Sequence, residues 1–139
     1  MDSQKMSSRT ALLVDGTGEL SQALPPRLEA RGYDVCIVSS ALEALQIVVA
    51  AHFDVVICDL KGFGLSRAAF QSALDRARMH LADRCLFVSP SGVLVNSADG
   101  LLCGRPINLG EILRNVAFLA SEPLAADDAV LTDLEFQHS

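Results

Sequence analysis

Tryptophan is absent from the chain, tyrosine occurs once, and the apolar runs are short. None of these runs approaches the roughly 20 residues that a membrane-spanning helix needs, and the opening MDSQKMSSRT has no apolar signal core. We therefore expect a cytoplasmic protein that does not insert into a membrane. Half of the 139 residues are hydrophobic and 20% are charged, which predicts a single globular domain.

Metal-ligand spacing is also missing. The cysteines form no C-x-x-C pair and have no neighbouring histidine, and the three histidines are scattered along the chain. Each cysteine falls within a predicted strand, so we interpret all four as buried thiols that pack as small hydrophobic side chains. These residues are Cys36, Cys58, Cys85 and Cys103.

Basic residues are lacking from positions 121–139, where five acidic residues lie. The other 120 residues hold 12 acidic and 11 basic residues, so they are almost neutral and give no indication of a nucleic-acid partner. We divide the chain into a flexible leader (1–9), a domain (10–120) and an acidic tail (121–139). Apolar residues in the tail, around Val130 and Leu134, would form a short amphipathic turn that docks on the domain or on a partner. The alternative is a solvated, disordered end.

Short apolar segments rich in β-formers alternate with helical patterns, which predicts β-α units around a parallel sheet. The segments read as continuous apolar runs, as expected for strands covered on both faces by helices. The fold class is therefore α/β with three layers. The five predicted strands are Ala11 to Val14, Val35 to Val38, Val55 to Cys58, Cys85 to Val88 and Leu101 to Cys103.

Helix signals separate these strands, with two irregularities. Capping-box patterns at 40–43 and 108–111 predict the starts of two helices. The first helix should run from about 19 to 31, yet Pro25-Pro26 lies in its middle, so we expect a kink or a late start. The connection at 90–100 is too short and too rich in glycine and serine for a full crossover helix, so we expect the fourth helix to be shortened or absent.

Polar residues follow four of the predicted strands. They are Asp15, Asp59, Ser89 and Arg105, and the carboxyl ends of strands are where ligands bind in open α/β sheets. The first and third strands should be neighbours, which would place Asp15 beside Asp59. Adjacent carboxylates repel each other, which raises a pKa or recruits a cation.

From about 10 to 120 the sequence resembles the receiver domain of bacterial response regulators. The matching motifs are LLVD with Asp15, ARGYDV, SALEAL, FDVVICDL with Asp59, CLFVS with Ser89, and GRP with Arg105. The resemblance implies a flavodoxin-like sandwich with strand order 2-1-3-4-5 and a cis peptide before Pro106. It also implies that Asp59 accepts a phosphoryl group from a histidine kinase. Magnesium would then bind at Asp15 and Asp59, while Ser89 and the residue at position 105 contact the phosphoryl group.

This chain departs from the family pattern in its chemistry. Gly16 replaces the second acidic residue, which predicts at most weak Mg²⁺ binding. Arg105 replaces a lysine, and its planar fork would pair with Asp59 and hold it unreactive. Leu102 replaces the aromatic residue of the family's switch. These departures predict a stand-alone pseudo-receiver, without enzymatic activity, that signals by protein contact and is phosphorylated weakly or not at all.

Two alternatives remain open. The first is a conventional Mg²⁺-dependent phosphoacceptor modified on Asp59, with Ser89 and Arg105 contacting the phosphoryl oxygens. The second is a small flavodoxin-like enzyme that binds a nucleotide or flavin at Gly16-Thr17-Gly18, because a glycine-rich turn at a helix start can cradle a phosphate.

Overall fold

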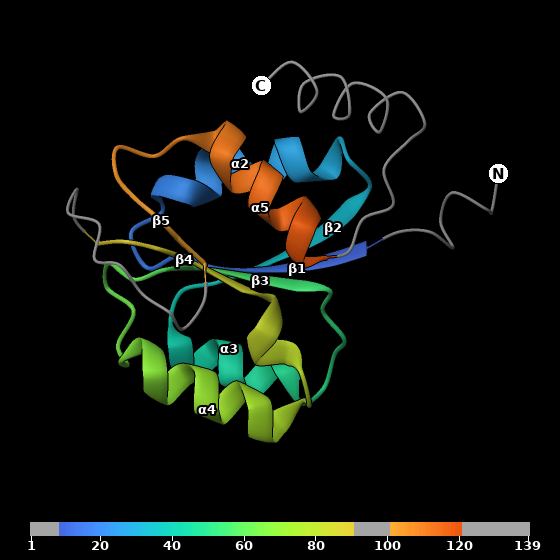
Figure 1. Ribbon diagram of the computed structural model, residues 1–139, viewed down its shortest axis with the longest axis vertical. Helices are drawn as coiled ribbons and strands as arrows, with labels where there is room; N and C mark the ends of the chain where they lie inside the picture. Colours follow the sequence, from blue (N-terminus) through green and yellow to red (C-terminus); the bar gives the residue numbers. More distant parts are fainter. Residues whose placement is uncertain (1–8, 91–100, 121–139) are drawn as a thin grey trace, which may run out of the picture.

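The computed structural model describes residues 9–90 and 101–120, which form a five-stranded parallel sheet between two layers of helices (Figure 1). The strand order is β2-β1-β3-β4-β5, as predicted. Helices α2 and α5 cover one face of the sheet, and α3 and α4 cover the other. The strands are β1 (Arg9–Val14), β2 (Tyr33–Val38), β3 (Val55–Asp59), β4 (Cys85–Val88) and β5 (Leu101–Cys103). The helices are α2 (Glu19–Glu29), α3 (Ala41–Val48), α4 (Arg67–Ala77), the 3₁₀ turn η1 (Leu81–Arg84) and α5 (Leu109–Leu119).

The first two strands begin two residues earlier than the apolar pattern predicted. Arg9 pairs in register with Tyr33, and Thr10 pairs with Asp34. These positions include polar side chains, so a prediction based on apolar runs does not include them in the strands. The third strand extends one residue further than predicted and ends at Asp59.

Alternate residues of the central strands pack into two separate cores. In β3, Val55 and Ile57 face α2 and α5, while Val56 and Cys58 face α3 and α4. Every residue of β3 is buried, which explains its apolar run from Val55 to Cys58. Three aromatic rings fill the α3/α4 side with edge-to-face contacts, in which ring centroids lie 4.8 to 6.5 Å apart. These rings belong to Phe63, Phe70 and Phe87.

Both predicted capping residues begin helices. The hydroxyl of Ser40 accepts a hydrogen bond from the backbone N–H of Glu43 (3.2 Å), and the Asn108 side chain accepts one from Glu111 N–H (3.0 Å). The Glu43 carboxylate accepts hydrogen bonds from the backbone N–H and the hydroxyl of Ser39, both at 2.7 Å. The Glu43 side chain therefore bonds to Ser39, one residue before the N-cap residue Ser40 that the capping-box pattern predicted.

Helix α2 begins at Glu19 and continues through both prolines, so the alternative of a late start is wrong. Pro25 and Pro26 have no N–H to donate to the preceding turn, which removes two hydrogen bonds from the helix. Burial offsets this loss, because three leucines spaced four residues apart pack into the core between α2, α5 and the sheet. They are Leu20, Leu24 and Leu28.

Several expectations concern residues outside the described part of the chain. The shortened or absent fourth helix falls on 91–100, and most of the leader and the whole acidic tail lie at 1–8 and 121–139. Among residues 9–90 and 101–120, no helix has the length and apolar character that crossing a membrane requires. The Arg105–Pro106 peptide bond is cis, as the family resemblance implied.

Candidate functional site

The four polar residues singled out in the sequence lie at the carboxyl edge of the sheet. Asp59 ends β3 and is fully buried, whereas Asp15 and Ser89 directly follow β1 and β4 and are also buried. Arg105 follows β5, and its side chain is 12% exposed. The parallel pairing of β1, β3, β4 and β5 brings these strand ends together.

Arg105 forms a two-pronged ion pair with Asp59. Its Nη1 donates to Oδ1 at 3.1 Å and its Nη2 donates to Oδ2 at 2.7 Å. The same guanidinium donates to the carbonyl oxygen of Ser89 and to the carboxylate of Glu19, the latter at 3.0 Å. The hydrogen bonds to Asp59 raise the pKa of Arg105; burial opposes this shift and Glu19 adds to it. The guanidinium is therefore a fixed positive charge that joins β3, β4 and α2.

Both carboxylate oxygens of Asp59 are engaged. Each accepts one Arg105 nitrogen, and Oδ1 also accepts the backbone N–H of Lys61 at 3.0 Å. A buried carboxylate is costly unless it is paired and hydrogen-bonded, and Arg105 supplies that compensation here. The sequence predicted this pair, and the structure contains it with bidentate geometry.

Asp15 anchors the start of α2. The N-cap residue of α2, Gly18, has no side chain to cap the helix, and Asp15 takes this role. Its Oδ2 accepts hydrogen bonds from the N–H (2.7 Å) and hydroxyl (2.6 Å) of Ser21. Its Oδ1 accepts from Thr17 N–H, Thr17 Oγ1 and Gly18 N–H. Burial opposes ionisation, but these hydrogen bonds outweigh it and lower the pKa of Asp15.

The pKa of Asp15 is lowered, whereas repulsion by a neighbouring carboxylate would raise it. Asp15 is satisfied by α2 and Asp59 by Arg105, so each negative charge has its own partners. The arrangement also opposes phosphate binding at Gly16-Thr17-Gly18. The N–H groups of Thr17 and Gly18, which would cradle a phosphate, donate to Asp15 instead.

We predict that Asp15→Asn lowers the free energy of unfolding by about 1–2 kcal/mol at pH 7, with or without Mg²⁺. The reason is that the asparagine NH₂ group would replace one acceptor oxygen and would face N–H and hydroxyl groups that are themselves donors. Asp15 has a lowered pKa in the folded state. Its contribution is therefore present above the unfolded pKa of about 3.9 and is lost as the pH falls through the folded value, so the difference between variant and wild type should narrow in acid. Urea unfolding at several pH values measures this. Asp34→Asn, at an exposed site, is the control; an Asp15 effect no larger than the control's would contradict the capping role.

Gly16 lies where the sequence resemblance places a second acidic residue, and it has no room for a side chain. A Cβ atom there would lie 2.9 Å from the carbonyl oxygen of Gly62 and 3.2 Å from that of Ser39. The segment that approaches Gly16 is fixed by Phe63, which is buried and whose carbonyl accepts a hydrogen bond from Ala41 N–H at 3.1 Å. Gly62 adopts φ = +71°, which favours glycine. Backbone atoms of Gly62 and Ser39 therefore occupy the space that an acidic side chain at position 16 would need.

Three contributors to this site have only weak signals in the sequence. Glu19 has no counterpart in the family motif, yet it binds Arg105. Ser21 gives Asp15 its two shortest hydrogen bonds, and only its position in the first turn of the helix could have indicated this. Phe63 holds the loop against Gly16, and an aromatic residue between two glycines was its only signal. Leu102, at the family's switch position, is partly buried against the α3/α4 core.

The donor set is poor for Mg²⁺. This ion requires an octahedron of oxygen ligands, usually with one or two available carboxylates. Both oxygens of Asp59 face Arg105, those of Asp15 face α2, and Gly16 offers none. Within the described ranges, no cluster of three or more acidic, histidine or cysteine side chains could hold a metal ion. Magnesium would have to compete with a fixed guanidinium for Asp59, so its binding would be weak.

All four cysteines are free, as predicted, but the prediction that all four are buried is wrong for Cys36. Cys58, Cys85 and Cys103 are buried, and burial raises the pKa of each of these thiols. Cys36 is partly buried against the α3/α4 core. None of them forms part of the polar site at the sheet edge.

Comparison with known proteins identifies the architecture. No family model matches the sequence, and no curated protein matches it. Solved structures do match. A CheY-like response regulator receiver domain protein from Methanospirillum hungatei is 19% identical with a TM-score of 0.70, over 84% of this chain and 96% of that one. The non-phosphorylated HemR receiver domain from Leptospira biflexa is 21% identical with a TM-score of 0.67, over 85% and 98%.

A third similar structure bears on the metal. The receiver domain of a sensor histidine kinase from Pseudomonas aeruginosa has a magnesium ion coordinated in its active site cleft. It is 14% identical to this chain with a TM-score of 0.64, and the match covers 84% of this chain and all of that one. The described chain therefore has the flavodoxin-like fold of response regulator receiver domains.

Proposed function

We propose that this chain is an atypical pseudo-receiver of two-component signalling that acts in the cytoplasm by protein contact, with phosphorylation of Asp59 weak or absent. The observation that supports this most is the bidentate pair between Arg105 and the fully buried Asp59. The receiver fold supports the class of function, and the residues at the carboxyl edge support the departure from its usual chemistry.

Phosphoryl transfer depends on positioning and on neutralisation of charge by a metal ion. In this site the neutralising charge belongs to the protein itself, because Arg105 occupies both oxygens of Asp59. A carboxylate held in this way is a poor nucleophile, and it leaves little room for Mg²⁺. The site would therefore keep a single charge state. A histidine kinase or another signalling protein would recognise that state as a constant surface, and the domain needs no catalytic activity of its own.

An amide NMR titration of the labelled chain tests this function. We expect that 10 mM Mg²⁺, followed by beryllofluoride as a phosphoryl mimic, leaves the amides of Asp15, Asp59, Ser89 and Arg105 unmoved relative to an Asp59→Asn control. Saturable shifts that disappear in the Asp59→Asn variant would overturn the proposal.

The convergence of Asp59, Ser89 and Arg105 at one edge is also the observation that favours the alternative, a conventional phosphoacceptor. Such a site would release Asp59 from Arg105 when Mg²⁺ binds, and the titration would then show the saturable shifts. The second alternative, a nucleotide or flavin enzyme, is opposed by the hydrogen bonds that Thr17 and Gly18 donate to Asp15.

A further inference from the structure

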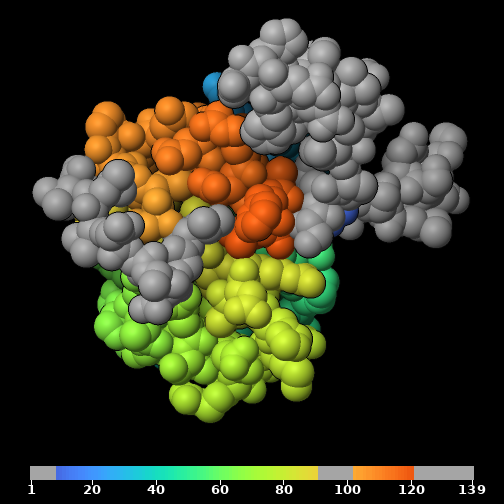
Figure 2. Space-filling view, viewed as in Figure 1, coloured from blue at the N-terminus to red at the C-terminus, as the bar shows by residue number. Residues whose placement is uncertain are grey.

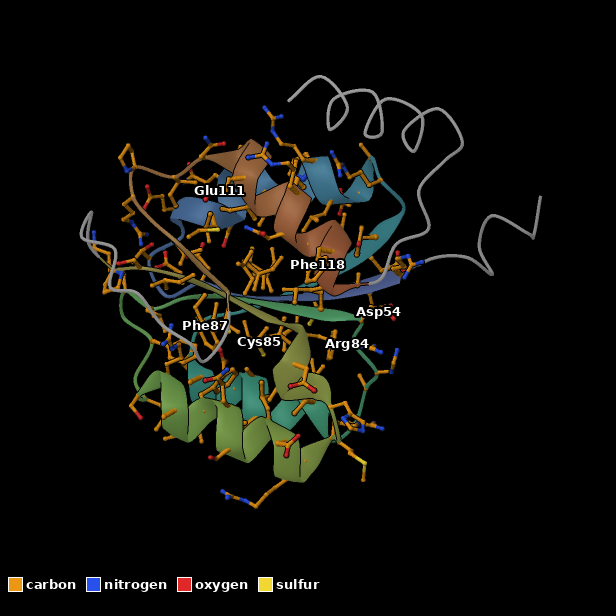
Figure 3. All side chains as sticks on the ribbon, in the orientation of Figure 1. Asp54, Arg84, Cys85, Phe87, Glu111 and Phe118 are labelled. Carbon is orange, nitrogen blue, oxygen red and sulfur yellow. The ribbon has the colours of Figure 1, made fainter. Side chains whose placement is uncertain are left out.

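A second polar site lies at the opposite edge of the sheet, where β3 and β4 begin. It is a pocket of about 350 Å³, formed by the segment before β3 and the segment between α4 and β4. Figure 3 shows Asp54 and Arg84, which precede these two strands, at the same end of the sheet. Two arginines and two histidines line the pocket together with apolar side chains; they are Arg78, Arg84, His52 and His80.

The two arginines of this pocket have no ion-pair partner within the described chain. His52 contacts Asp54 at 3.2 Å, and His80 lies 3.7 Å from Asp83, so each histidine has an acidic neighbour. Neither Arg78 nor Arg84 forms an ion pair with any residue in 9–90 or 101–120. These two guanidinium groups can therefore bind carboxylates from another segment.

The pocket also has features that distinguish an acidic peptide from a small inorganic anion. Arg78 is oriented by a hydrogen bond from its Nε to the carbonyl oxygen of Val48 at 2.9 Å, and no hydrogen bond of its terminal nitrogens to another described residue is present. Met79, between Arg78 and His80 in sequence, has 78% of its surface exposed. An exposed apolar side chain beside two guanidinium groups fits a segment that carries both carboxylates and apolar residues.

Ala120, the last described residue before such a segment, lies at this same edge. The side chain of Arg9 donates to the carbonyl oxygen of Ala120 at 2.8 Å, and the next residue, Thr10, donates from its hydroxyl to the carbonyl oxygen of His52 at 2.9 Å. Ala120 is thus connected through Arg9 and Thr10 to His52, which lines the pocket. Figure 2 shows the end of α5 (red-orange) and the segment before β4 (yellow) on one face of the molecule.

We propose that residues 121–139 bind in this pocket, with carboxylates on Arg78 and Arg84 and an apolar side chain against Met79. The segment has five acidic residues, no lysine or arginine, and apolar residues among them. Its 19 residues can extend over roughly 60 Å, ample to pass around the sheet edge. Covalent attachment gives the segment an effective concentration on the order of millimolar, so a few weak contacts are enough. This binding is independent of the state of Asp59.

Neutralising the acidic residues in the full chain tests the proposal. The variant replaces Glu122 and Glu135 by Gln, and Asp127, Asp128 and Asp133 by Asn. We expect the amides of His52, Met79, His80 and Arg84 to shift relative to wild type. We also expect a synthetic peptide of residues 121–139 to bind this variant about tenfold more tightly than wild type, whose own segment competes. Unmoved pocket amides, or equal affinity of the peptide for both proteins, would overturn the proposal.

A pair of arginine variants locates the binding surface. Arg84→Gln should shift amides in 121–139, whereas Arg27→Gln, which removes the same charge from the exposed side of α2, should not. The reverse result would place the segment on α2 and overturn the proposal. A dilution series shows whether the bound segment belongs to the same chain or to a second copy. Chemical-shift differences at the pocket that disappear on dilution would mean that a second copy supplies the segment, which would contradict binding within one chain.

Discussion

Replacement of Arg105 by glutamine is expected to lower the free energy of unfolding by about 3–5 kcal/mol at pH 7. The reason is that Asp59 is fully buried and depends on Arg105 for two of its hydrogen bonds and for its counter-charge. The substitution also removes the links from Arg105 to Glu19 and to the Ser89 carbonyl. A lysine at this position keeps the charge but loses the two-pronged geometry, so Arg105→Lys should lie between glutamine and wild type.

Urea unfolding of the three proteins measures these differences. Arg114→Gln is the matched control, because Arg114 is exposed on α5 and forms no ion pair within the described ranges. We expect the control to change the free energy of unfolding by less than about 0.5 kcal/mol. An Arg105→Gln protein within about 1 kcal/mol of wild type would show that Asp59 does not depend on this pair.

Substitution of Gly16 by alanine is expected to cost about 1–3 kcal/mol of stability. The new methyl group would press against two backbone carbonyl oxygens, those of Gly62 and Ser39, at distances that require the backbone to move. The burial of Phe63 and its hydrogen bond to Ala41 oppose that movement. The same reasoning applies to Gly16→Asp, so restoring the family's second acidic residue would not by itself restore a metal site.

Gly110→Ala is the control for this prediction. Gly110 is an exposed helical residue, and a Cβ atom there would meet only side-chain atoms, at 3.4 and 3.7 Å. Because alanine is favoured over glycine in a helix, this variant should be more stable than wild type by up to about 1 kcal/mol. Equal effects of alanine at positions 16 and 110 in urea unfolding would mean that the approach of Gly62 to Gly16 is not tight.

Much of the fold follows from the sequence because the segments of parallel strands that helices cover on both faces are apolar. The runs at Val55 and Cys85 predicted the central strands, and the resemblance to receiver domains implied their order. The same rule missed the starts of β1 and β2, where Arg9 and Asp34 extend the pairing without adding apolar surface. The prolines in α2 pointed to a kink or a late start, but the helix begins at Glu19, because the packing of its leucines outweighs the local effect of the prolines.

The candidate site was predictable in its members but not in all of its partners. Strand ends placed Asp59, Ser89 and Arg105 together, and the fork of arginine predicted its pairing with Asp59. The role of Asp15 was not predictable from strand order, because it depends on the backbone N–H groups of a helix start. Nor does a sequence motif reveal that the loop after β3 approaches Gly16, since that contact joins backbone atoms.

The coupling free energy between Asp59 and Arg105 tests most directly the claim that arginine, rather than a metal ion, holds the carboxylate. It is obtained from the unfolding free energies of wild type, Asp59→Asn, Arg105→Gln and the double variant, with and without 10 mM Mg²⁺. We expect a coupling of about 2–3 kcal/mol, and no change in wild-type stability on addition of Mg²⁺. A coupling near zero would contradict this account. So would a Mg²⁺-induced gain of about 1.4 kcal/mol in wild type alone, which corresponds to a Kd of about 1 mM.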